Sequence, residues 1–169
     1  MVRDLHPNFA ARVWDARACA ALLLDGPAVD ATHARLARRA GEWSADPAIA
    51  LFADGVELVS EADGPDGLMA HLPPGTHWLR LASHSAVPRE IDRRQDPRQL
   101  GVAVTHLALD GQPVALDSPR LRGGFHPVET DQAAAWRWTD GEAVVEVCGA
   151  SRVGVRFAAQ WLRYPRAAG

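Results

Sequence analysis

From Asp46 onwards, apolar and polar residues alternate with a period of two in short runs. This period is typical of strands that bury one face, because successive side chains of a strand point to opposite sides. The predicted strands lie at residues 49–53, 56–59, 68–72, 77–83, 102–109, 114–116, 143–148 and 153–162. The run at 102–109 is apolar on both faces and therefore predicts a central strand that is covered on both sides.

Asp-Gly dipeptides separate consecutive runs and favour tight hairpin turns, because both residues tolerate a positive φ. They lie at residues 54–55, 110–111 and 140–141. Many short strands joined by such turns predict a mainly β protein, and more specifically an antiparallel, jelly-roll-like β-sandwich over residues 46–164. Two polar stretches, 88–99 and 117–135, are predicted to be long loops, which often carry function in compact domains.

The first 43 residues have helical periodicity instead. Asn8 suits the N-cap of one helix, and Pro27 suits the first turn of a second helix. The second helix carries one apolar stripe, formed by Val29, Leu36, Ala40 and Trp43. We therefore expect an N-terminal helical pair over residues 1–43, which covers the sandwich within a single domain of residues 1–169.

The composition excludes several kinds of chemistry and partner. All 18 basic residues are arginine, so reactions that need a side-chain amine, such as Schiff-base formation, are excluded. The net charge of −3 offers no basic field, so no nucleic-acid partner is predicted. No apolar run approaches the roughly 20 residues of a membrane-spanning helix, so no membrane insertion is expected.

The cysteines and histidines show no metal-binding pattern. Cys19 and Cys148 could form a disulfide or stay reduced, and buried free thiols are the favoured alternative. There is no CxxC pair and no HExxH or His-x-His spacing, so neither a metal site nor a cofactor is predicted. His106 lies in an apolar run and is expected to be buried and hydrogen-bonded.

Two tryptophans separated by one residue, Trp136 and Trp138, would share one face of a strand. If that face were open, the two indoles would form a platform on which the apolar faces of sugar rings stack, while charged neighbours bind the hydroxyl groups. The candidate ligand-binding residues are Trp136, Arg137, Trp138, His126, Glu129 and Asp140. The alternative, favoured because large aromatic side chains are usually buried, places both indoles in the core.

No catalytic residues are predicted, because the chain has no nucleophile-elbow motif and no glycine-rich phosphate loop. A hydrolase that uses Glu129, Asp140 and His126 is the least favoured hypothesis, since nothing in the sequence sets the separation of the two carboxylates. The charged run at 89–98 could bind an anion through its arginines, but a solvated loop whose charges pair with one another is favoured.

A series of short phrases occurs in a characteristic order along most of the chain. They are HPNFAARVW at 6–14, ARACA at 16–20, DPA at 46–48, LPPG at 72–75, LRL at 79–81, RQLGVAV at 98–104, GFHP at 124–127 and WRWTDG at 136–141. This order resembles the C-terminal region of bacterial proteins that carry a hedgehog/intein (Hint) domain. The resemblance implies a position after a self-processing domain, and it carries no catalytic residues with it.

The sequence therefore favours a non-catalytic accessory or binding module that recognises a carbohydrate or a cell-surface partner. The alternative is a structural domain that supports an adjacent Hint domain and has no ligand of its own. An exposed Trp136/Trp138 pair would favour the binding module, whereas an exposed apolar face on the N-terminal helices would favour the structural domain. The cellular location is not indicated by the sequence.

Overall fold

The computed structural model describes residues 26–39, 43–91, 96–158 and 162–165. The chain divides into two compact units, Met1–Ala40 and Gly41–Gly169. The single domain predicted from the sequence stays a prediction. Within the described part of the chain, no helix is long and apolar enough to cross a membrane.

The N-terminal unit contains helix α2 (Pro27–Arg39). Its start follows from local chemistry: Gly26 adopts a φ of 94°, Pro27 occupies the first turn, and the amide of Asp30 donates to the carbonyl oxygen of Gly26 at 3.0 Å. The carboxylate of Asp30 also suits the positive end of the helix dipole. The earlier helix predicted from Asn8 lies outside the described residues, which contain one helix of the predicted pair. Trp43, which was predicted to belong to the second helix, lies in the strand Trp43–Ser44 instead, so that part of the prediction is wrong.

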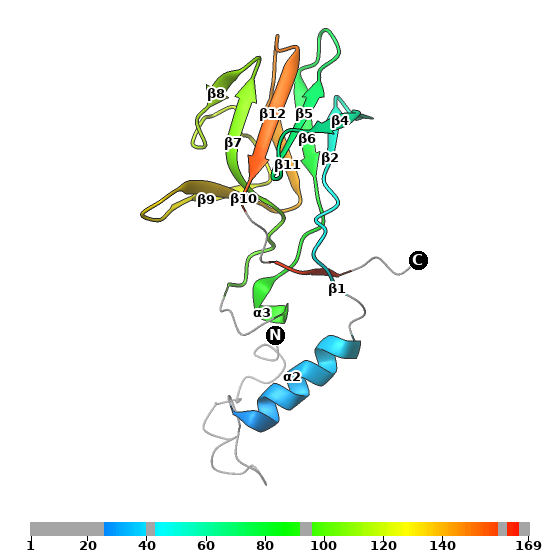
Figure 1. Ribbon diagram of the computed structural model, residues 1–169, viewed down its shortest axis with the longest axis vertical. Helices are drawn as coiled ribbons and strands as arrows, with labels where there is room; N and C mark the ends of the chain where they lie inside the picture. The colour runs from blue at the N-terminus through cyan, green and yellow to red at the C-terminus, as the bar shows by residue number, and fades with distance from the viewer. Residues whose placement is uncertain (1–25, 40–42, 92–95, 159–161, 166–169) are drawn as a thin grey trace, which may run out of the picture. The chain divides into compact units, whose positions relative to one another are not determined.

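The second unit, the β unit, is built from short strands and one helical turn (Figure 1). The strands are β1 (Trp43–Ser44), β2 (Ala50–Ala53), β3 (Val56–Glu57), β4 (Ser60–Ala62), β5 (Gly67–His71), β6 (Trp78–Ala82), β7 (Ala103–Leu109), β8 (Gln112–Val114), β9 (Phe125–Thr130), β10 (Ala135–Thr139), β11 (Glu142–Glu146), β12 (Arg152–Phe157) and β13 (Tyr164–Pro165). The helical turn is α3 (Pro88–Ile91), which lies in the first of the two predicted loops.

The strands form three sheets in which every pairing is antiparallel. The largest sheet has the order β4-β5-β12-β7-β10-β9, and β8 also pairs with β7. The second sheet has the order β11-β6-β2-β3, and the smallest pairs β1 with β13. The prediction of a mainly β protein with antiparallel sheets is confirmed.

Two of the three predicted Asp-Gly hairpins are present. Asp54-Gly55 joins β2 to β3, and Asp110-Gly111 joins β7 to β8, with a positive φ at both residues of each turn, as a type I′ turn requires. The hairpin predicted at Asp140-Gly141 is wrong, because β10 belongs to the largest sheet and β11 to the second. The turn carries the chain from one sheet to the other, since β10 pairs with β7 and β9 whereas β11 pairs with β6.

Buried side chains from both larger sheets meet in one core cluster. Its members are Leu51, Ala70, Leu72, Leu79, Leu81, Val102, Val104, Leu107, Leu109, Ala143, Val145, Val147, Val153, Val155 and Phe157. A second core cluster contains Ala86, Leu100, Ala103, Trp138, Leu162 and Tyr164. Burial raises the pKa of Tyr164 to about 12, and its hydroxyl donates to the carbonyl oxygen of Gly101 at 2.8 Å.

Two details of the strand predictions are wrong. Strand β7 is internal to its sheet, as predicted, but His106 on that strand is exposed, so the strand is not covered on both faces. The second predicted loop, 117–135, contains β9 and the start of β10. Strand β9 was missed because all six of its side chains are exposed or half-buried, so its sequence lacks an apolar alternation.

Candidate functional site

The two tryptophans of β10 do not form an open platform. Trp138 is 5% exposed and belongs to the second core cluster, and Trp136 is partly buried against the same cluster. Ile91 of α3 also packs against this cluster. The open platform is therefore absent, and the favoured interpretation, burial of the indoles in the core, holds for Trp138 and in part for Trp136.

Arg137, between the two tryptophans, is committed to backbone groups. Its guanidinium donates to the carbonyl oxygens of His126 at 2.6 Å and Leu116 at 2.8 Å, and it lies over the Phe125 ring at 5.2 Å from the ring centre. Burial lowers the pKa of Arg137, and the nearby charge of Asp117 acts in the opposite direction. This side chain therefore joins the segment before β9 to β9 and β10.

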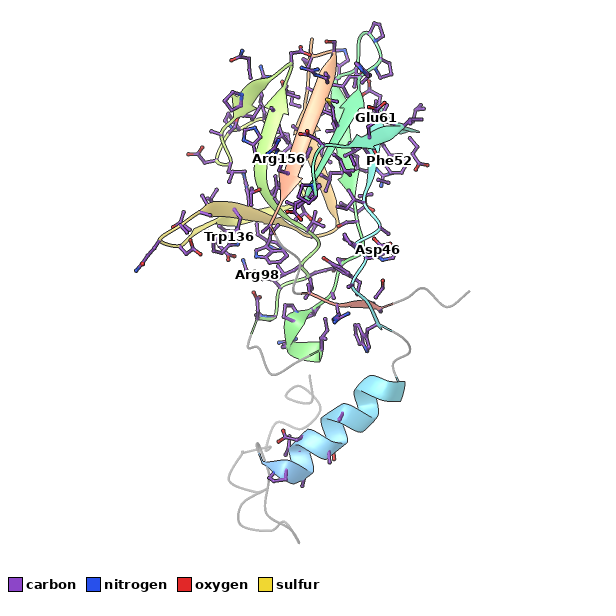
Figure 2. All side chains as sticks on the ribbon, viewed as in Figure 1. Asp46, Phe52, Glu61, Arg98, Trp136 and Arg156 are labelled. Atoms are coloured by element: carbon purple, nitrogen blue, oxygen red, sulfur yellow. The ribbon has the colours of Figure 1, made fainter. Side chains whose placement is uncertain are left out.

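Glu129 and His126 are also held by protein groups. The Glu129 carboxylate pairs with the Arg98 guanidinium at 2.6 Å, and Arg98 pairs with Asp96 at 2.7 Å. Hydrogen bonding from Arg98 lowers the pKa of the Asp96 carboxyl. The Nε2 atom of His126 lies 2.8 Å from the carbonyl oxygen of Gln99, which places its proton on Nε2 as the donor. Figure 2 shows Arg98 and Trp136 close to the β9–β10 hairpin.

Asp140, the last of the six predicted residues, lies in the turn between the two sheets. Its carboxylate accepts a hydrogen bond from the amide of Glu142 at 2.8 Å. The structure thus brings His126, Glu129, Trp136, Arg137 and Trp138 together, and we call these five residues the tryptophan cluster. The contacts of these side chains are with protein groups around β9 and β10, so the cluster holds this part of the fold together.

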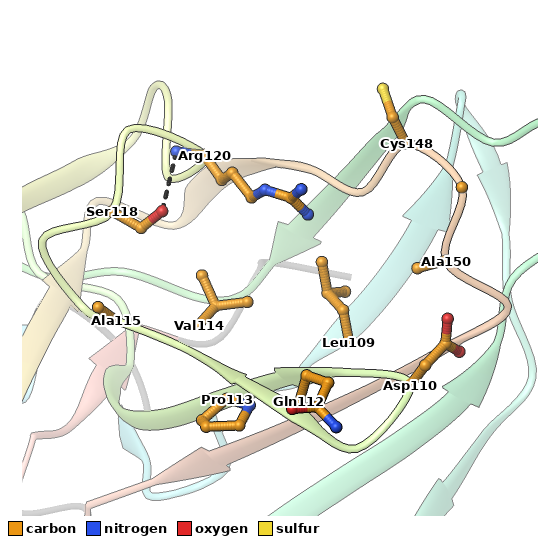
Figure 3. Close-up of a pocket in the computed structure, with 11 residues that line it drawn as sticks. Leu109, Asp110, Gln112, Pro113, Val114, Ala115, Ser118, Arg120, Cys148 and Ala150 are labelled. Carbon is orange, nitrogen blue, oxygen red and sulfur yellow. Dashed lines mark hydrogen bonds between the residues drawn. The ribbon is translucent and has the colours of Figure 1, made fainter.

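A pocket of about 450 Å³ lies elsewhere in the β unit, beside the β7–β8 hairpin (Figure 3). Three chain segments form its walls: the hairpin itself, the segment that follows β8, and the turn between β11 and β12. The lining residues are Leu109, Asp110, Gln112, Pro113, Val114, Ala115, Ser118, Arg120, Cys148, Gly149 and Ala150. We call this cavity the hairpin pocket.

The hairpin is tied to the opposite wall by the Asp110 carboxylate. It accepts hydrogen bonds from the amide of Ser151 at 3.0 Å, the hydroxyl of Ser151 at 2.8 Å and the amide of Arg152 at 2.9 Å. These bonds, the Ser151 hydroxyl first among them, lower the pKa of Asp110. Because these hydrogen bonds join the β7–β8 hairpin to the segment that follows the β11–β12 turn, the pocket is formed before any ligand arrives.

The third wall is anchored to β11. Leu121 is buried and forms a bridge with Val145, and the amide of Glu146 donates to the carbonyl oxygen of Arg120 at 2.8 Å. The backbone of Arg120 is therefore fixed at the edge of the second sheet. In Figure 3 its guanidinium extends from this wall toward Leu109 and Ala150 on the other side of the pocket.

Cys148 lies on the pocket wall, and its sulfur points away from the other lining side chains in Figure 3. Its thiol is free and exposed, so the prediction of a buried thiol is wrong for this residue, while Cys19 lies outside the described residues. The Nδ1 atom of His77 is 3.4 Å from the sulfur. Within the described residues, no group of three or more histidine, cysteine or acidic side chains could hold a metal ion.

Sequence reasoning did not identify the hairpin pocket. The Asp110-Gly111 turn was predicted, but the contact between this turn and Ser151 joins residues 41 positions apart. Comparisons of the chain with protein families, curated proteins and solved structures gave no match. The resemblance to the region after a Hint domain therefore stays a prediction.

Proposed function

We propose that this chain is a non-catalytic binding module for a carbohydrate, and that its site is the hairpin pocket. The observation that carries the proposal is a cavity whose walls are cross-linked by the Asp110 carboxylate. A preformed cavity binds more tightly than a flexible one, because less conformational entropy is lost on binding. The tryptophan cluster, which first suggested carbohydrate binding, has no part in this site.

The size and lining of the pocket suit a small sugar. Its volume of about 450 Å³ lies within the usual range of small-molecule sites, roughly 300–1,000 Å³. Pro113 and Val114 offer apolar surface for the C–H face of a sugar ring, while the Gln112 amide and the Ser118 hydroxyl can bond to its hydroxyl groups. None of the described residues that line the pocket is aromatic, so we expect hydrogen bonds to contribute more than stacking.

We further infer that the two larger sheets pack face to face as a jelly-roll-like sandwich. The shared core cluster supports this architecture, since Leu51 and Leu81 of one sheet belong to it together with Val104 and Val155 of the other. In such a sandwich the loops gather at the ends, where binding sites often occur. A place beside a Hint domain is compatible with this role. A purely structural domain would need no preformed cavity.

The test is a glycan-array screen of the full chain with a variant that fills the pocket. Ala115→Trp places an indole in the cavity, and Ala62→Trp, at an exposed position of β4 outside the lining, is its matched control. We expect the parent and Ala62→Trp to bind the same glycans and Ala115→Trp to lose them. Trp136→Ala should retain binding. A folded parent that binds no glycan would overturn the proposal in favour of the structural alternative.

A further inference from the structure

The charged groups around the hairpin pocket are not equally available to a ligand. Asp110 already accepts hydrogen bonds from three donor groups, the amide and the hydroxyl of Ser151 and the amide of Arg152. Glu146, near the Arg120 backbone, is paired with Arg122 at 2.5 Å. Each of these carboxylates is therefore occupied by a protein partner.

Arg120 is different. Its backbone amide donates to the Ser118 hydroxyl at 3.3 Å, and its carbonyl oxygen accepts from Glu146. Among the residues that the structure describes, no carboxylate pairs with its guanidinium. The guanidinium lines the pocket, so its N–H groups are available to donate hydrogen bonds to a ligand there.

Arg122, two residues further along, is an arginine whose guanidinium already has a carboxylate partner. It lies on the same segment, but its guanidinium is paired with Glu146 and it is absent from the pocket lining. The two arginines are two residues apart on the same segment, and among the described residues only Arg122 has a carboxylate partner. This makes Arg122 a matched control for Arg120.

We propose that the hairpin pocket selects a sugar that bears a carboxylate, such as a uronic acid, through the guanidinium of Arg120. The inference rests on the proposed carbohydrate-binding function and names the class of sugar. A planar guanidinium binds a carboxylate with two parallel hydrogen bonds, which a neutral hydroxymethyl group in the same place cannot provide. The apolar side of the pocket, Pro113 and Val114, would lie against the ring.

The experiment is a titration of the full chain with sodium D-glucuronate and with D-glucose, followed by the amide NMR signals of Gln112, Ser118 and Gly149. These two sugars have the same ring and differ in the carboxylate. We expect glucuronate to shift the pocket signals and to bind about tenfold more tightly than glucose, since a charge-assisted hydrogen bond is roughly twice as strong as a neutral one. Arg120→Gln should remove this preference, and Arg122→Gln should keep it.

Three results would overturn the inference, and they differ in what they say about the proposed function. Equal binding of both sugars that Arg120→Gln leaves unchanged would reject the acidic class and leave the carbohydrate module standing. Binding of sodium acetate as tight as that of glucuronate would show an anion site without sugar recognition. No shift with either sugar, together with an array that shows no glycan binding, would reject both proposals.

Discussion

The tryptophan cluster and the hairpin pocket use similar residue types in opposite ways. In the cluster, Arg137 donates to two backbone carbonyl oxygens and Glu129 pairs with Arg98. These charged groups are therefore already bonded to other groups of the protein. In the pocket, Arg120 lines a cavity and, among the described residues, no carboxylate neutralises it. Charged and aromatic residues therefore identify a binding site only where their polar groups are not already bonded to other protein groups.

The sharpest test of this comparison is the substitution Trp138→Ala. If Trp138 is a core side chain, its removal leaves a cavity and lowers the free energy of unfolding by about 3–5 kcal/mol. Trp78→Ala, at a side chain that is 44% exposed, is the control and should cost far less. Urea denaturation followed by circular dichroism measures both. Equal small losses for the two variants would contradict the core assignment.

Arg137→Leu should have the next largest effect. It leaves the carbonyl oxygens of His126 and Leu116 without their donor, which costs about 1–3 kcal/mol of unfolding free energy if no water replaces it. Arg122→Leu, which removes an exposed ion pair, is the control and should cost less than about 1 kcal/mol. The same denaturation experiment compares them. An Arg137→Leu variant as stable as the control would mean that Arg137 is available for a ligand after all.

A smaller effect is expected from the pH dependence of the Asp110 contact. The pKa of Asp110 is lower in the folded chain than its ordinary value of about 4. The contact therefore stabilises the folded chain fully at a pH above about 4. This stabilisation is lost as the pH falls through the lowered pKa of the folded chain. Asp110→Asn should therefore lose less stability than the parent between about pH 5 and pH 2. Unfolding free energies measured across that range test this. Parallel pH profiles for the two proteins would show that the contact is unimportant.

The smallest effect should come from Cys148. Its sulfur is exposed and points away from the pocket interior, so iodoacetamide should alkylate the native protein readily and leave glycan binding nearly unchanged. The experiment uses a Cys19→Ser background and intact-mass measurement, so that the adduct is assigned to one thiol. Alkylation that occurs only in denaturant would show that Cys148 is covered, and alkylation that abolishes binding would place its sulfur inside the site.

The sequence predicted most of the strands, and local patterns explain why. The apolar run at 102–109 and the Asp110-Gly111 turn correctly predicted β7 and the hairpin that follows it, while the strand predicted at 114–116 shares only Val114 with β8. The same dipeptide type at 140–141 was misread, because a turn signal contains no information about which sheet the next strand joins. Strand β9 escaped detection because its exposed side chains produce no apolar period.

Of the hairpin pocket, sequence reasoning predicted the Asp110-Gly111 turn, while the candidate residues that it named lie in the tryptophan cluster and at Asp140. The types and spacing of Trp136, Arg137 and Trp138 were visible, and so were the Asp-Gly turns, because backbone preferences and strand periodicity act over a few residues. The burial of Trp138, and the lack of a carboxylate partner for Arg120 among the described residues, depend on which distant segments pack beside them. Desolvation and hydrogen-bond pairing are properties of that packing, and they separate a structural arginine from one that can bind a ligand.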